Sequence, residues 1–347
     1  MADFDELYLK HNKEMEDFWS RRANAPKFQK TIRVFGHPVI FDSNHEKVLD
    51  SASLAEEMYS KTDVSSGKTW RIRITVPSQP SPGSPPERLI DLIHYTGADD
   101  WLSIDLLEWG NCFVDMKRGE AFAVLSSSLA EHPQLVCQVL INTILTNFIT
   151  RHGYSMLHAS ALIKGENILL LQAPHGTGKS TTALRLLLNG HRLLSDSMVY
   201  IGERGGDLWM GGFPVGRIKL RTDMLSLFPA LAAEAEAEPV RGETKHRVEL
   251  KRVDTEMAYS QMILIRRVEY CLLERWDASE SRLEPLTGEE LWPAIMVNSL
   301  HYDTPEMWNE NSRRIGLMLR HANLHRLRIG TSENGIIKTV NDLWQTR

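Results

Sequence analysis

A lysine and a serine follow a glycine-rich turn near the middle of the chain, in the segment APHGTGKST at residues 173–181. In such a turn the consecutive backbone N–H groups can bind an anion. A lysine at this place reaches the β- and γ-phosphates of a nucleotide, and the serine hydroxyl binds Mg²⁺. A glycine turn that merely joins a strand to a helix is the alternative. We predict that the phosphates of ATP are bound by His175, Gly176, Thr177, Gly178, Lys179, Ser180 and Thr181.

The residues on either side of this turn predict the elements that hold it. An apolar run at residues 168–171 has the length of a strand, and leucines at helical spacing follow over residues 184–188. Gly190 ends the helix, because glycine readily adopts the left-handed conformation of a helix stop. The strict phosphate-loop pattern has glycine where this chain has Ala173. Strand, glycine turn, Lys-Ser and helix together nevertheless predict a phosphate-binding loop.

Asp196 follows a second short apolar strand, Leu193-Leu194. A strand, a helix and a returning strand form a unit with parallel strands, whose carboxyl ends meet at one edge of the sheet. Asp196 is therefore expected to face the phosphate loop. A carboxylate there can bind metal or accept a proton from an attacking hydroxyl. A polar cap on a strand end is the alternative interpretation. We predict Ser180 and Asp196 as metal ligands, and Lys179 and Asp196 as catalytic residues.

The stretch LHASALIKGENILLLQAPHGTGKSTTALRLLLNGHRLLSDSMVYI, residues 157–201, resembles the catalytic core of HPr kinase/phosphorylase and its relatives. It is similar, more distantly, to ATP-dependent phosphoenolpyruvate carboxykinase. The resemblance implies a mixed-sheet P-loop kinase domain, ATP at the loop, Mg²⁺ at Ser180 and Asp196 as catalytic base. It also implies that His158 is a catalytic residue that assists at the metal or phosphate, because it matches a histidine near the metal or phosphate in the carboxykinase.

The chain departs from the pattern of these families in three ways. Ser197 stands where the family has a second acidic residue, and His175 stands where relatives often have serine. The glycine-rich segment that follows the acidic pair in HPr kinase/phosphorylases has no counterpart. The chain therefore looks more like a stand-alone relative, such as those encoded with modified-peptide pathways, whose acceptor is a serine hydroxyl of a peptide.

Composition narrows the class of protein. The chain has 347 residues, 42% of them hydrophobic and 24% charged, with a net charge of −5 that argues against a general nucleic-acid binder. Its three cysteines form no metal or disulfide spacing, which favours a reducing cytoplasm. No apolar run approaches the length of a membrane span. We predict an α/β protein with an N-terminal accessory α+β domain at residues 1–130 and a P-loop catalytic domain at residues 131–347.

Four further segments carry expectations. Arg217 and Lys219 alternate with apolar residues, so both point to one face of a strand, where they either bind phosphates or lie on a solvated face. Residues 4–22 and 132–151 have the patterns of helices, and residues 154–163 are expected to form one strand that carries His158. Residues 231–247 are predicted to form a helix end and a mobile loop.

The function expected from these residues is ATP-dependent transfer of a phosphoryl group to a hydroxyl, with Mg²⁺ and with a serine of a peptide or protein as acceptor. Two alternatives are a nucleotide-regulated binding protein without catalysis and a small-molecule kinase. The sequence sets neither the acceptor nor the choice of ATP over GTP. The oligomeric state is not set either, and a homo-oligomer stays open.

Overall fold

A computed structural model describes residues 26–65, 67–78, 82–174, 176–240, 242–298 and 304–344. The predicted helix at residues 4–22 lies outside these ranges, and so does His175. The chain divides into two compact units. One contains residues up to Glu56 together with Ser65–Phe148, and the other contains Glu57–Val64 together with Ile149–Arg347. Among the described residues, none of the helices has the length and apolar character needed to cross a bilayer.

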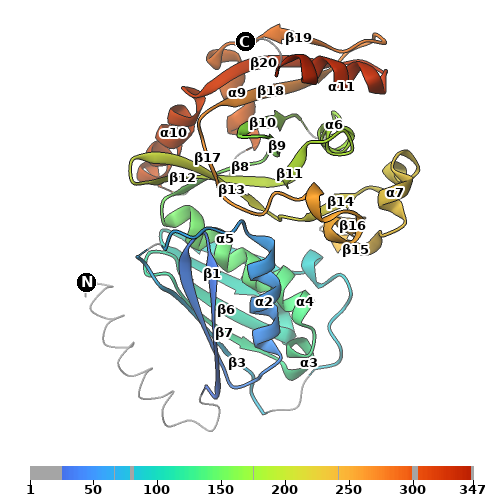
Figure 1. Ribbon diagram of the computed structural model, residues 1–347. Coiled ribbons are helices and arrows are strands. Elements are labelled where there is room, and N and C mark those ends of the chain that lie inside the picture. The colour runs from blue at the N-terminus through green and yellow to red at the C-terminus, as the bar shows by residue number, and fades with distance from the viewer. Residues whose placement is uncertain are drawn as a thin grey trace. The chain divides into compact units, whose positions relative to one another are not determined.

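The first unit is built on a seven-stranded sheet in the order β1-β2-β3-β7-β6-β5-β4. Figure 1 shows α2, α4 and α5 beside this sheet. The strands β2, β3 and β7 run parallel to one another, whereas the remaining pairs are antiparallel. The bounds are β1 Phe28–Val34, β2 His37–Ser43, α2 Val48–Met58, β3 Trp70–Thr75, η1 Leu89–Asp91, β4 His94–Ala98, β5 Trp101–Asp105, η2 Leu107–Trp109, β6 Gly110–Asp115, β7 Glu120–Leu125, α3 Ser127–Ala130 and α4 Pro133–Val136.

The helical stretch after this sheet belongs largely to the first unit. It continues from α4 through a π-helical segment, η3 (Cys137–Ile141), into α5 (Asn142–Arg151), which agrees with the helix predicted at residues 132–151. The ring of Phe148 packs against Trp70 of β3 with centroids 5.5 Å apart. The first unit therefore extends to Phe148, whereas the sequence placed the boundary at residue 130, and Glu57–Val64 is assigned to the second unit.

The second unit contains three sheets: β11-β9-β10-β18-β20-β19, β17-β13-β12-β8 and β14-β16-β15. Parallel and antiparallel pairs both occur in the first of them, which confirms the α/β class. The bounds are β8 Tyr154–Leu157, β9 Ser160–Lys164, β10 Asn167–Gln172, α6 Lys179–Leu187, β11 Arg192–Ser195, β12 Met198–Arg204, β13 Asp207–Phe213, β14 Arg217–Leu220, η4 Thr222–Leu227, α7 Pro229–Ala232, β15 Glu236–Val240, β16 Glu243–Glu249, α8 Leu250–Val253, η5 Thr255–Met257, β17 Ile263–Leu264, β18 Val268–Arg275, β19 Arg282–Pro285, α9 Gly288–Asn298, α10 Pro305–Leu319, β20 Ala322–Ile329 and α11 Glu333–Asp342.

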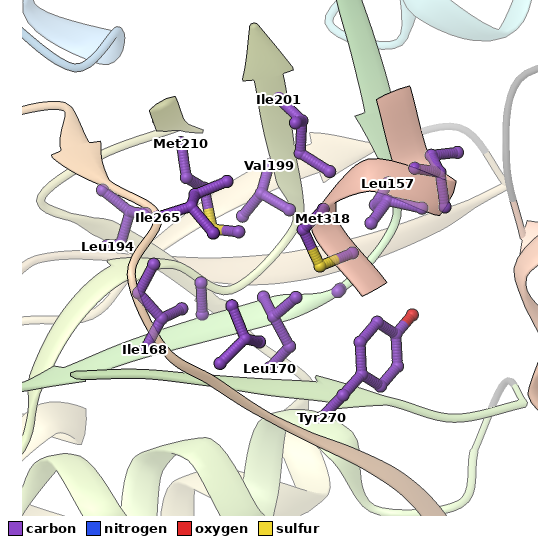
Figure 2. Packing of buried hydrophobic residues seen from close by; sticks show 14 of the residues in the cluster. Leu157, Ile168, Leu170, Leu194, Val199, Ile201, Met210, Ile265, Tyr270 and Met318 are labelled. Atoms are coloured by element: carbon purple, nitrogen blue, oxygen red, sulfur yellow. The ribbon is translucent and has the colours of Figure 1, made fainter. Parts of the chain in front are cut away.

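Strand β10 is covered on both faces, which explains its unbroken apolar sequence. Residues 168–172 are all buried. Ile168 and Leu170 belong to a core shared with β8, β12, β13, α9 and α10, and Figure 2 shows them near Val199 and Met318. Leu169 and Leu171 belong to the opposite core, with residues of α6, β14 and α11. The end of β10 is therefore fixed between two packed layers.

His191 fixes the turn between α6 and β11 as an uncharged imidazole. Its Nδ1 lies 3.2 Å from the carbonyl oxygen of Leu186, and its Nε2 accepts a hydrogen bond from the Trp344 indole at 3.3 Å. One ring nitrogen thus donates and the other accepts, as in the neutral form. Burial lowers the pKa of His191 to about 4.

We expect this histidine to make the stability of the protein depend on acidity. The unfolded chain takes up a proton near pH 6.5, before the folded chain does, so the stabilisation by neutral His191 is complete above that pH and is lost as the pH falls towards about 4. His191→Asn keeps a donor for Leu186 but cannot titrate. Chemical unfolding between pH 7 and pH 4.5 should show a steeper loss in the wild type, by up to about 1.4 kcal/mol per pH unit. Equal slopes would contradict the assignment.

Candidate functional site

Two glycines in the loop between β10 and α6 have positive φ angles. Gly176 has φ of +79°, and Gly178, the N-cap of α6, has φ of +114°. These angles favour glycine, whereas space around Gly176 would admit a side chain. The first helical hydrogen bond runs from the amide of Thr182 to Gly178 O at 2.9 Å. The amides of residues 179–181 therefore have no acceptor within the helix and can bind an anion.

Lys179 extends from the first position of α6 to the end of β11. Its Nζ donates to the main-chain oxygen of Asp196 at 3.1 Å. Burial lowers the pKa of Lys179, while the charge of Asp196 raises it and that of Lys245 lowers it. Because its partner is a neutral carbonyl, the ammonium would gain a stronger, charge-assisted hydrogen bond from a phosphate.

Asp196 lies directly after β11 and its carboxylate is partly buried. Ser160, the first residue of β9, donates from Oγ to Asp196 Oδ1 at 2.5 Å. No donor from the described residues is recorded for the other carboxylate oxygen. The orientation of this carboxylate is thus fixed by a neutral hydroxyl, which leaves one oxygen for a proton or a metal ion.

The turn that carries Asp196 is held by the neighbouring serine. Ser195 donates from Oγ to the carbonyl oxygen of Phe213 at 2.8 Å. The same oxygen accepts from the amides of Ser197 and Met198, at 3.1 and 3.2 Å. A hydroxyl with one donated and two accepted hydrogen bonds is fully used, so Ser195 is a structural residue of this turn.

The predicted continuous strand at residues 154–163 is wrong, because the chain changes sheets there. β8 pairs with β12 in the four-stranded sheet, and β9 pairs with β10 and β11 in the six-stranded sheet. His158 lies in the break between β8 and β9 and is exposed. It therefore precedes Ser160 by one intervening residue, at the same end of β9 that contacts Asp196.

Arg217 and Lys219 occupy one face of β14, as their alternation predicts, but both are paired with carboxylates. Arg217 Nη2 lies 2.6 Å from Glu249, and Lys219 Nζ lies 2.6 Å from Glu238. The structure records no contact between either cation and the described part of the loop. Arg247 of β16 belongs to the same ion-pair network, because it also contacts Glu238.

The predicted mobile loop at residues 231–247 is also wrong, since most of this segment forms the hairpin β15–β16. Alternation of charged residues explains the hairpin. Arg247 of β16 pairs with Glu236 of β15 at 2.6 Å, directly opposite in the register. Opposite charges across an antiparallel pair stabilise it. The acidic and basic runs belong to two paired strands, and the short helix α7 precedes them.

Sequence reasoning missed two residues near the loop. Ser160, which positions Asp196, was hidden in an apolar strand with no motif around it. Arg275, at the end of β18, donates to the carbonyl oxygen of Gly176 at 2.6 Å. The sequence feature that could have indicated Arg275 is its place at the carboxyl end of an apolar run. Parallel strands end at the same edge of a sheet, so the end of β18 lies beside the end of β10.

The donors present fit Mg²⁺ bound together with a polyphosphate. Magnesium usually takes one or two protein oxygens, substrate phosphates and waters. The Ser180 hydroxyl at the start of α6 and one Asp196 oxygen supply such a set. Within the described ranges, no cluster of three or more His, Cys, Asp or Glu side chains could hold a metal ion by itself.

Comparison with known proteins gives distant similarity to solved structures alone. No family model and no curated protein matches the chain. Among solved structures, the chain is similar to the Hpr(Ser) kinase/phosphatase from Coxiella burnetii, with 12% sequence identity and a TM-score of 0.28. The match covers 55% of this chain and 96% of that one.

We expect Lys179→Ala to weaken ATP binding by roughly 10- to 100-fold, because a charge-assisted hydrogen bond to phosphate is lost. The variant should still fold, since Asp196 keeps its hydrogen bond from Ser160. Calorimetric titration checks the affinity. Lys251→Ala, which removes an exposed lysine paired with Glu57 at 3.9 Å, is the matched control. Equal ATP affinities in the folded Lys179 variant and the wild type would rule out the phosphate-loop assignment.

Proposed function

We propose that the second unit is an ATP-dependent phosphotransferase that transfers the γ-phosphoryl group of ATP to a hydroxyl. One observation carries the proposal. Lys179 stands at the first position of the helix that follows the glycine loop. Its ammonium donates a hydrogen bond to the main-chain oxygen of Asp196, the residue directly after β11. A donor for phosphates and a carboxylate for the acceptor are thus neighbours at one edge of the six-stranded sheet, as a phosphoryl transfer requires.

The residues divide the reaction between them. The amides of residues 178–181 and the Lys179 ammonium would bind the phosphates and stabilise charge that moves to the leaving ADP. Asp196 would accept the proton of the acceptor hydroxyl. The hydroxyl oxygen would then bond to the γ-phosphorus while the bond from the γ-phosphorus to ADP breaks. Mg²⁺, when bound by Ser180, Asp196 or both, would neutralise charge on the phosphate oxygens. Transfer of this kind depends mainly on positioning and charge.

Ser160 gives Asp196 a defined orientation for this role. Its hydroxyl occupies Oδ1, so Oδ2 is the oxygen that would face the acceptor. His158 lies at the same strand end and would assist at the phosphate or the metal. Arg217 and Lys219 would bind phosphate only after exchanging their present carboxylate partners, so we assign them a secondary place in the site.

We infer that the acceptor is a serine of a peptide or protein, and that the fold is of the HPr kinase type. The support is the resemblance of residues 157–201 to that family, and the absence of its second acid and glycine-rich segment favours a stand-alone relative. A cytoplasmic location agrees with three buried, free thiols, Cys112, Cys137 and Cys271. Nucleic acid and membrane are not expected as partners.

A nucleotide-regulated binding protein is the second candidate, and one observation favours it. Ser197 carries no charge, and its amide is used in the turn around Ser195. With Ser197 uncharged, the Asp196 carboxylate would be enough to hold a nucleotide with its metal ion, without transfer of a phosphoryl group. A small-molecule kinase would use the same residues as the proposed enzyme and differs from it only in the acceptor.

Asp196→Asn separates the two roles open to Asp196, that of a base and that of a metal ligand. If Asp196 is the base, ATP affinity should persist while transfer of labelled γ-phosphate falls by roughly 10²- to 10⁴-fold. If Asp196 holds the metal, the variant should lose Mg²⁺ dependence and ATP affinity together. Transfer rates measured with candidate peptides decide between them, and equal rates in both proteins would refute the catalytic role.

Ser160→Ala tests the orientation of the carboxylate. The variant keeps Asp196 but removes the hydrogen bond to Oδ1, so transfer should fall by less than in Asp196→Asn, while ATP affinity is retained. Ser160→Thr, which keeps the hydroxyl, should restore part of the rate. A rate in Ser160→Ala equal to that of the wild type would remove Ser160 from the site.

A further inference from the structure

Arg275 contacts the outside of the glycine loop from the neighbouring strand. It is the last residue of β18, which runs parallel to β10 with Leu171 opposite Cys271. Its Nη2 donates to Gly176 O at 2.6 Å, and its Nε lies 3.3 Å from Thr177 O. The side chain is exposed. A guanidinium thus binds two consecutive carbonyl oxygens of the loop through two of its donors.

The direction of these carbonyls determines the direction of the loop amides. In a planar trans peptide, C=O and N–H point in opposite directions. With Thr177 O turned towards Arg275, the amide of Gly178 points away from the guanidinium. With Gly176 O held in the same way, the amide of Thr177 also points away, and it closes the turn onto Pro174 O at 3.3 Å.

Stability alone gives a weak reason for this contact. Gly176 is exposed and Thr177 is only partly buried, so water can satisfy their carbonyl oxygens when the guanidinium is absent. An ordered loop matters more for a ligand that needs several amides at once, because binding then costs no reorganisation of the loop. The positive charge of Arg275 beside the loop also favours an anion.

We propose that Arg275 is a positioning residue of the phosphate site, which holds the carbonyls of Gly176 and Thr177 in place and so pre-orients the Gly178 amide for a polyphosphate. This inference rests on the proposed function, because it needs a phosphate at the loop. It predicts a role in binding of the phosphates rather than in the acceptor step.

The experiment compares nucleotide affinity in five forms of the full chain by calorimetry: wild type, Arg275→Ala, Arg275→Lys, Arg282→Ala and Lys179→Ala. Arg282 is the matched control because it is exposed near the same strand end, where it stacks 4.0 Å over Trp276 and contacts Glu284 rather than the loop. ATP and AMP are titrated into each form, and melting temperatures are recorded.

Arg275→Ala should lower ATP affinity by about tenfold while AMP affinity and the melting temperature stay nearly unchanged. Arg275→Lys, which keeps the charge and one donor, should recover part of the loss. Free guanidinium at millimolar concentration should do the same in Arg275→Ala. A purely structural contact would lower the melting temperature and would not respond to guanidinium.

Different results would overturn the role of Arg275 and the proposed phosphate site. If Lys179→Ala weakens ATP binding but Arg275→Ala binds ATP as the wild type does, the role of Arg275 is overturned and the phosphate site stands. If Arg275→Ala and Arg282→Ala lower the affinity equally, a general effect of surface charge replaces the specific one, and the inference is also overturned. If Lys179→Ala has no effect, the proposed function itself fails.

Discussion

The hydrogen bond from Lys179 to the main chain of Asp196 is the contact on which the proposed chemistry depends. It joins the first turn of α6 to the end of β11, although the strand β9 lies between β10 and β11 in the sheet. The two buried cores on either face of the sheet hold this contact in place, because β10 and β11 cannot shift without disturbing the packing of both cores. The site therefore lies at an edge of a packed sheet, and the glycine loop supplies the positive φ angles of Gly176 and Gly178.

Hydrogen bonds to neutral groups orient most of the site. Ser160 orients the carboxylate of Asp196, Ser195 holds its turn, and a carbonyl holds the Lys179 ammonium. The direct hydrogen-bond partners of lysine and aspartate are therefore neutral groups, while the charge of Asp196 acts on Lys179 from nearby. A bound polyphosphate could accept charge-assisted hydrogen bonds from Lys179 in place of the neutral carbonyl, which agrees with a nucleotide at this loop. The cations of β14 show the opposite case, because each already has a carboxylate partner.

Local signals in the sequence predicted the centre of this unit well. The apolar run of β10, the glycines, and the Lys-Ser pair gave the strand, loop and helix, since each depends on residues close in sequence. Parallel β10 and β11 were also expected, but the strand β9 between them was not, because pairing between strands is a long-range property. The break at His158 escaped detection for the same reason: apolar residues flank it on both sides, and only the two sheets determine where the chain turns. The alternation of charged residues could have predicted the hairpin β15–β16, but the segment was interpreted from its composition instead.

The most direct test of the account is hydrogen exchange at the amides of residues 178–181, measured by mass spectrometry with and without ATP and Mg²⁺. These amides have no acceptor within the helix, so they should exchange rapidly in the free protein and slowly when phosphate binds them. The account predicts protection on ATP addition that is centred on this loop and the turn after β11, and that disappears when adenosine replaces ATP. Unchanged exchange in residues 178–181 at saturating ATP, or protection confined to another part of the chain, would contradict a phosphate site at this loop.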